Sequence, residues 1–142
     1  MLRREGIGVI RIAFGAFLAL HGLVHLLYAA HSQRMLELQP DMKWPDDSWA
    51  FSALMGDGVT RALATGCCIL ATAGFVIGGG ASLLHQSWWR SPVLASTALS
   101  AVMVLIFWDG RLQRLNDQGL IALLLNALIV LLLVVLQWPA SL

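Results

Sequence analysis

Charge is scarce in this sequence: only 12% of its 142 residues are Asp, Glu, Lys or Arg, whereas 58% are hydrophobic. Soluble globular domains carry roughly a quarter charged residues, so this chain has too few to cover a surface that faces water. Its nine basic and eight acidic side chains leave a net charge of +1, which excludes a strongly basic nucleic-acid-binding protein. The composition predicts a membrane protein whose first partner is the lipid bilayer, with no nucleic acid bound.

Cysteine is equally scarce: the chain has two, Cys67 and Cys68, and no Cys-x-x-Cys pair. Neighbouring residues on a helix point about 100° apart, so the two thiols are not expected to form a disulfide with each other. Cysteines in apolar helices serve as small packing residues more often than as redox centres. A thioredoxin-like chemistry is therefore not expected of this chain by itself.

Metal-ligand motifs are missing as well. No His-Glu-x-x-His or comparable ligand set occurs. Of the four histidines, His31 and His85 fall outside the apolar runs on opposite faces, where neither can oppose His21 or His25 across a haem. We expect no bound metal and no haem, which leaves a quinone or a lipid as the cofactor to consider.

Four long gaps separate the few charges, and each is long enough for a membrane-spanning helix of about 20 apolar residues. Continuous apolar runs without alternation favour helices over strands. We expect an all-α integral membrane four-helix bundle, a single transmembrane domain over 1–142, with helices at about 7–30, 59–79, 91–108 and 119–138. Gly78, Gly79 and Gly80 are expected to stop the second helix, because glycine tolerates left-handed backbone angles.

The longest connection, 31–58, holds five of the eight acidic residues. It predicts either an ordered loop or a short interfacial helix around Trp49 to Met55. The six tryptophans sort to the two membrane interfaces, where such residues anchor membrane proteins. The acidic connection, together with Arg3 and Arg4 at the start of the chain, predicts a multi-pass protein of the cell membrane with its N-terminus inside.

Counting depth along antiparallel helices, at about 1.5 Å per residue, brings polar side chains from all four spans toward one layer. His21, Cys67, Ser100 and Asn126 fall at about the same depth, and His25 lies one turn nearer the acidic connection. Asp57 and Arg61 stand above this layer at the end of the second helix. Polar side chains inside a membrane usually face the bundle interior or a cavity, so these seven residues are the candidate ligand-binding set.

His21 and His25 are four residues apart and share one side of their helix. They can hydrogen-bond to neighbouring helices and hold the bundle together. They can equally contact a ligand or carry a proton. Binding of a metal is the third reading, and the missing ligand set speaks against it. The sequence leaves the structural and the ligand-binding readings open.

The first helix carries the pattern Arg11-x-x-x-Gly15-x-Phe17-x-x-x-His21-Gly22. This pattern resembles the opening helix of the DoxX-like family of small four-helix membrane proteins. Members of that family usually carry a lysine three residues after the glycine of the His-Gly pair, where this chain has His25. The resemblance implies an accessory subunit of a membrane redox complex, linked to quinone-dependent sulfur oxidation or oxidative-stress defence.

The leading hypothesis is a bundle that opens toward the acidic connection and binds an amphipathic small molecule, a quinone or a lipid. His21 and His25 would contact the head group, and Arg61 or Asp57 would line the entrance. One alternative is a lipid or sterol isomerase that uses a buried histidine; no carboxylate lies deep in a span, which argues against an enzyme. Another is a purely structural subunit packed against a redox partner or a second copy of the chain.

Overall fold

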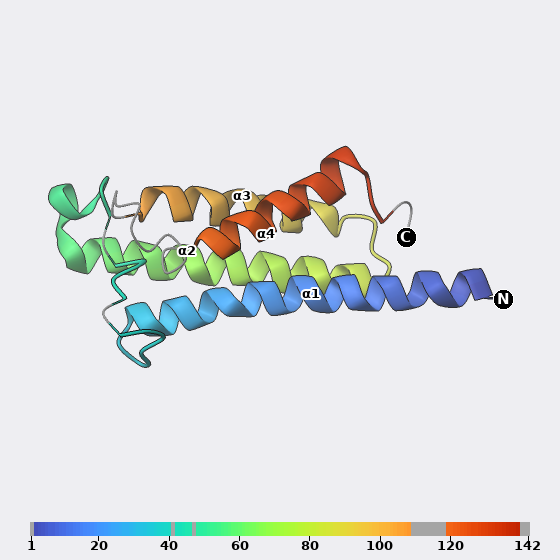
Figure 1. Cartoon of the computed structure of the whole chain (residues 1–142), viewed down its shortest axis with the longest axis horizontal. Helices are drawn as coiled ribbons and strands as arrows, with labels where there is room; N and C mark the ends of the chain where they lie inside the picture. Colours follow the sequence, from blue (N-terminus) through green and yellow to red (C-terminus); the bar gives the residue numbers. More distant parts are fainter. Residues whose placement is uncertain (1, 41, 47, 109–118, 140–142) are drawn as a thin grey trace.

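The computed structural model describes residues 2–40, 42–46, 48–108 and 119–139, with side chains from residue 8 onward. Within these ranges every regular element is helical: α1 (Leu2–Ser32), α2 (Ser52–Leu83), α3 (Arg90–Ile106) and α4 (Leu120–Val130), which continues into the π-helical segment η2 (Leu131–Val135). Successive helices run antiparallel in an elongated bundle (Figure 1). The all-α, four-helix expectation is confirmed. The polar connection 109–118 lies outside the described residues.

Two of the helices, over Gly8–Ser32 and Ser52–Leu83, are long and apolar enough to cross a membrane, while α3 and α4 with η2 are shorter apolar helices. Their outward faces are apolar too. The exposed large side chains include Leu20, Leu70, Ile121, Leu124 and Val135, each more than 60% accessible. So many exposed large apolar side chains are unusual for a soluble monomer, on which such residues are normally scattered singly.

The second helix is longer than the sequence predicts at both ends. It begins at Ser52, and the turn that precedes Gly56 is separated from the rest by a kink at that residue (φ 77°, ψ 164°). This first turn lies within the segment from Trp49 to Met55, for which the sequence predicts either a loop or a short interfacial helix. At the other end the helix runs through its three glycines to Leu83. The expectation that they stop the helix is wrong.

The glycines continue the helix because packing requires them there. A Cβ on Gly78 would clash with Val93 of α3, and a Cβ on Gly79 would lie 2.8 Å from the backbone oxygen of Gly15 in α1. Small residues let helices approach this closely. The tertiary contacts therefore outweigh the tendency of glycine to end a helix.

Two apolar clusters form the core, and one lies at each half of the bundle. The first is centred on Phe14, Leu18, Phe75, Trp89 and Ile129, and the second on Trp44, Cys68, Met103 and Phe107. Trp44 and Trp89 are thus buried, packed edge-on against Tyr28 and Phe14 respectively. Neither ring faces outward, and the place of these two tryptophans at the membrane interfaces stays a prediction.

The acidic connection folds over one end of the bundle. The Ser48 hydroxyl donates to the Ile106 carbonyl (2.6 Å), and the Trp49 backbone N–H donates to the Trp108 carbonyl (3.0 Å). The His31 ring donates from Nε2 to the Met42 carbonyl (3.0 Å). These bonds tie the connection to the ends of α1 and α3.

The contrast between two neighbouring glycines tests the α1–α2 contact. We expect Gly79→Ala to destabilise the protein by about 1–2 kcal/mol, because overpacking forces the two backbones apart. Gly80→Ala is the matched control: a Cβ there meets nothing within 4 Å, and the better helix propensity of alanine should stabilise by up to about 1 kcal/mol. Thermal unfolding of both variants in detergent measures the difference. Equal midpoints would contradict the close approach.

Candidate functional site

Four polar side chains from three helices meet between the two apolar clusters. They are His21 and His25 of α1, Ser100 of α3 and Asn126 of α4, and each is at most 5% accessible. On α1, α3 and α4 they lie between the residues that contribute to the first cluster and those that contribute to the second. The structure therefore brings together four of the seven residues that the sequence singles out.

These side chains form one continuous hydrogen-bonded network. His25 Nδ1 lies 3.0 Å from the His21 backbone carbonyl oxygen, and His25 Nε2 lies 2.7 Å from Ser100 Oγ. Asn126 Nδ2 donates to Ser100 Oγ at 2.8 Å, and Asn126 Oδ1 lies 3.0 Å from His21 Nε2. The network links α1 to both α3 and α4, and it gives each of these four side chains a hydrogen-bond partner without water.

Two aromatic rings hold the histidines in place. Phe75 of α2 packs edge-on against His21, with ring centroids 4.8 Å apart, and lies 5.7 Å from the His25 ring. Phe17 stacks on His21 from one turn away, with an interplanar angle of 12°. Sequence reasoning did not place Phe75 at the site, because nothing in an apolar helix marks which of its residues faces a distant histidine.

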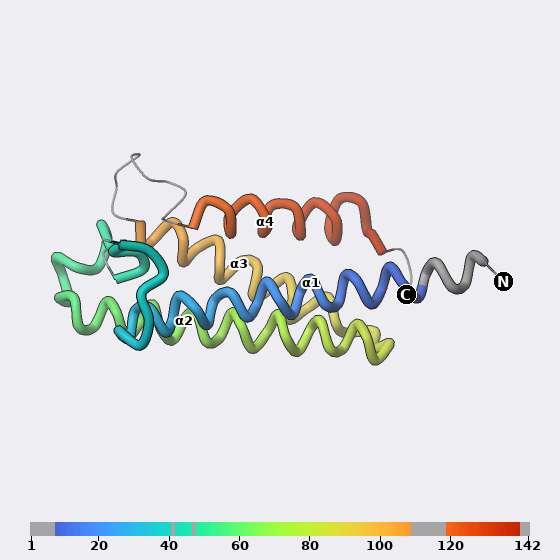
Figure 2. Tube along the Cα trace, turned by 60° about the horizontal axis from the view of Figure 1, so that its bottom comes forward, coloured from blue at the N-terminus to red at the C-terminus, as the bar shows by residue number. Residues whose placement is uncertain are grey.

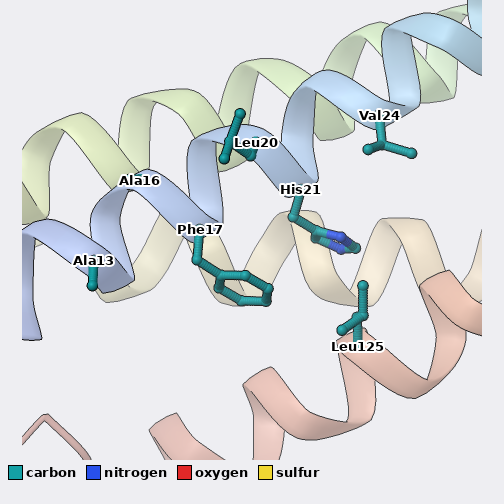
Figure 3. A pocket seen from close by; sticks show the side chains of 7 residues that line it. All are labelled: Ala13, Ala16, Phe17, Leu20, His21, Val24 and Leu125. Atoms are coloured by element: carbon teal, nitrogen blue, oxygen red, sulfur yellow. The ribbon is translucent and has the colours of Figure 1, made fainter.

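Beside this network a groove of about 390 Å³ runs between α1 and α4. Its lining is Ala13, Ala16, Phe17, Leu20, His21, Val24 and Leu125. The rings of His21 and Phe17 project from α1 toward α4, where Leu125 faces them (Figure 3). The volume falls within the range of about 300–1,000 Å³ that is usual for small-molecule sites.

The groove exists because the bundle does not close at this seam. Backbones pack closely for α1 with α2, α2 with α3, and α3 with α4, while α1 and α4 approach each other at few points. In Figure 2, α4 runs along the side of the bundle opposite α2. The hydrogen bond from His21 to Asn126 is the polar link across this seam.

The α1 side of the groove has a pattern that sequence reasoning did not use. Its six lining residues recur at spacings of three and four, from Ala13 through His21 to Val24, which places them on one helical stripe. Four of them are exposed: Ala13, Ala16, Leu20 and Val24. Two alanines, Ala13 and Ala16, lie on the same apolar stripe as His21, and this pattern was the sequence signal that could have indicated a groove.

The remaining three predicted site residues lie elsewhere. Asp57 is exposed just after the Gly56 kink, and Arg61 is half-buried one turn on. Cys67 is half-buried and packs against the second apolar cluster, while Cys68 points inward and donates to Met103 Sδ. None of the three lines the groove. Their predicted part in ligand binding stays a prediction, and the expected opening toward the acidic connection differs from the lateral opening seen here.

Arg11 occupies an unusual position on the same helix. Its side chain is 5% accessible, and Nε and Nη1 have no hydrogen-bond partner among the described residues. It lies ten residues, roughly 15 Å along the helix, from His21. Arg11 is thus separate from the polar network and does not line the groove.

Among the described residues, no group of three or more His, Cys, Asp or Glu side chains is arranged to hold a metal ion. In comparisons with family models, with curated proteins and with solved structures, no match to this chain is found. The resemblance of the first helix to DoxX-like proteins therefore stays a prediction.

Proposed function

We propose that the protein is a multi-pass integral membrane protein of the cell membrane that binds an amphipathic small molecule in the groove between α1 and α4. The molecule is a quinol, a quinone or a lipid, with its head group at His21 and its apolar part along the exposed stripe of α1. Like many sites of its kind, the groove is largely apolar with one polar group that fixes orientation.

Length and surface support the membrane assignment of all four helices. Two helices satisfy the requirement for a span outright. The 17 residues of α3 rise roughly 26 Å, close to the hydrocarbon thickness of about 30 Å, and α4 with η2 is of similar length. We place the N-terminus inside, because Arg3 and Arg4 lead the chain and the connection 31–58 has more acidic than basic residues.

One observation carries the ligand-binding proposal: among the described residues that line the groove, His21 is the only one with a polar side chain. A polar group that borders hydrocarbon is costly unless it has a partner. His21 uses Nε2 within the network, no hydrogen bond to its Nδ1 is found within the described part of the chain, and the residue lines the groove. A ligand head group supplies the partner that lipid tails cannot.

The pattern from Arg11 to Gly22 supports a more specific role as the accessory subunit of a membrane redox complex, as in DoxX-like proteins. In that role the small molecule is a quinone-type carrier shared with the partner. The exposed apolar faces that do not border the groove provide the surface for that partner or for a second copy of the chain.

The network also favours a second candidate, a purely structural subunit. His25 is 1% accessible, and both of its ring nitrogens bond within the bundle, as expected of a scaffold residue. An isomerase is less well supported, since the groove lining contains no carboxylate to work with His21 as an acid–base pair.

A groove-filling variant separates the ligand-binding candidate from the structural one. Ala16 is exposed and lines the groove, so Ala16→Phe should block the groove without touching the network. Ala98→Phe is the matched control, at an exposed position of α3 outside the groove. Native mass spectrometry of the detergent-purified proteins should show a retained small molecule in wild type and Ala98→Phe, and none in Ala16→Phe. Equal retention in all three contradicts the groove as the site.

A further inference from the structure

We propose that the groove selects ligands whose head group donates a hydrogen bond, such as a long-chain alcohol, a phenol or a quinol, over ligands that only accept one, such as a quinone or an ether. This inference rests on the proposed function and names the class of molecule that the groove takes. It follows from the direction of the hydrogen bonds in the buried network.

The donors and acceptors of the network can be assigned starting from His25. A backbone carbonyl can only accept, so the bond to the His21 carbonyl oxygen requires a proton on His25 Nδ1. A neutral imidazole carries one N–H, and His25 Nε2 is therefore an acceptor. Its partner at 2.7 Å, the Ser100 hydroxyl, must donate to it.

The same rule then fixes the other two side chains. Because the Ser100 proton points to His25, Ser100 Oγ accepts from Asn126 at 2.8 Å, which requires the amide nitrogen on that side. The amide oxygen of Asn126 consequently faces His21 and accepts from its Nε2–H at 3.0 Å. Every donor in this series of hydrogen bonds has one acceptor. Reversing the direction of the bonds would require His25 to be protonated on both ring nitrogens while buried.

These hydrogen bonds make Nδ1 of His21 a hydrogen-bond acceptor. With the proton on Nε2, the neutral His21 ring has a lone pair on Nδ1. No hydrogen bond to Nδ1 is found within the described part of the chain, and the ring lines the groove. The other lining side chains are those of alanine, phenylalanine, leucine and valine, so they neither donate nor accept. A single acceptor in an apolar groove complements a single donor on an apolar ligand.

A pair of ligands that differ only in the donor tests the inference on the wild-type protein. The probes are 4-decylphenol and 4-decylanisole, in which a methyl group replaces the phenolic proton. Their affinities are measured on the full chain in lipid nanodiscs, and binding at the groove is defined as the part that Ala16→Phe removes. We expect the phenol to bind about tenfold more tightly, as one hydrogen bond to a desolvated acceptor predicts.

Two variants test whether Asn126 sets the selectivity. Asn126→Leu removes the group that holds the proton on His21 Nε2, so the ring can protonate at Nδ1 and the phenol preference should fall to about twofold or less. Leu125→Ala, at the neighbouring groove position, should weaken both ligands and keep the tenfold ratio. If Asn126→Leu fails to fold, the wild-type ratio still decides.

The outcomes separate the two proposals. Equal affinities, or tighter binding of the anisole, would overturn the donor selectivity and leave the groove as a ligand site. If neither probe shows binding that Ala16→Phe removes, both this inference and the proposed function are overturned.

Discussion

Replacing His25 by alanine should lower the free energy of unfolding by about 3–4 kcal/mol. Its side chain is 1% accessible and bonds to both the His21 backbone and Ser100. The substitution leaves a cavity, for which large-to-small core changes cost about 2–5 kcal/mol, and it leaves buried polar groups without their partner. Denaturant titration of the detergent-solubilised protein measures the loss.

The neighbouring residue provides the control for His25. Leu26 is 39% accessible on the outer face of α1, so Leu26→Ala should cost less than about 1 kcal/mol. His21→Ala should fall between the two, since one side of the His21 ring already borders the groove. Similar losses for His25 and Leu26 would contradict the structural role of the network.

The Phe75→Ala substitution should have an effect of the same size, about 3–5 kcal/mol. Phe75 is fully buried, contacts both histidine rings and lies against Gly22 of α1. Its loss opens a cavity beneath the network and releases His21, so ligand retention should fall together with stability. Denaturant titration and native mass spectrometry of one sample measure the two effects.

Val76 serves as the control for Phe75, because it is the next residue on α2 and is 39% accessible. The Val76→Ala change should leave ligand retention unchanged and lower stability by less than about 1 kcal/mol. If Phe75→Ala unfolded at the same midpoint denaturant concentration as the wild type, the histidine pair would not depend on the Phe75 ring for its stability.

The depth of the polar residues in the bundle was predictable from the sequence, but the direction in which each side chain points around its helix was not. The rise per residue and the antiparallel order bring His21, Ser100 and Asn126 to one layer, and hydrogen bonds join them in the structure. The same count includes Cys67, yet the neighbouring Cys68 is the one that faces inward. A step of one residue turns the side chain by about 100°, which a count of depth does not resolve.

The groove was not predictable for a related reason. It depends on which pair of helices fails to close, and apolar runs of similar composition do not say which helices will be neighbours. The glycines of α2 decide this in part: Gly79 packs against α1 while Gly78 packs against α3. This places α2 between them and leaves α1 and α4 as the open seam. The prediction of an entrance at Asp57 and Arg61 used depth alone.

The structure also separates the two histidines, which the sequence treats as a pair. They share one face of α1, but His25 has both ring nitrogens bonded inside the bundle, whereas His21 has one of them bonded and lines the groove. Under the proposed function, His25 takes the structural role and His21 the ligand-binding role. In the proposed network, His25 sets the proton position of His21 through Ser100 and Asn126.

The measurement that tests this account most directly is ¹⁵N NMR of histidine-labelled protein in nanodiscs, with 4-decylphenol added stepwise. It distinguishes a protonated ring nitrogen from a bare one, and His21→Phe and His25→Phe spectra assign the signals. We expect a proton on Nε2 of His21 and on Nδ1 of His25, and we expect the signal of the unprotonated His21 Nδ1 to move as the phenol binds. A proton on His21 Nδ1, or a His21 signal that the phenol does not move, would contradict it.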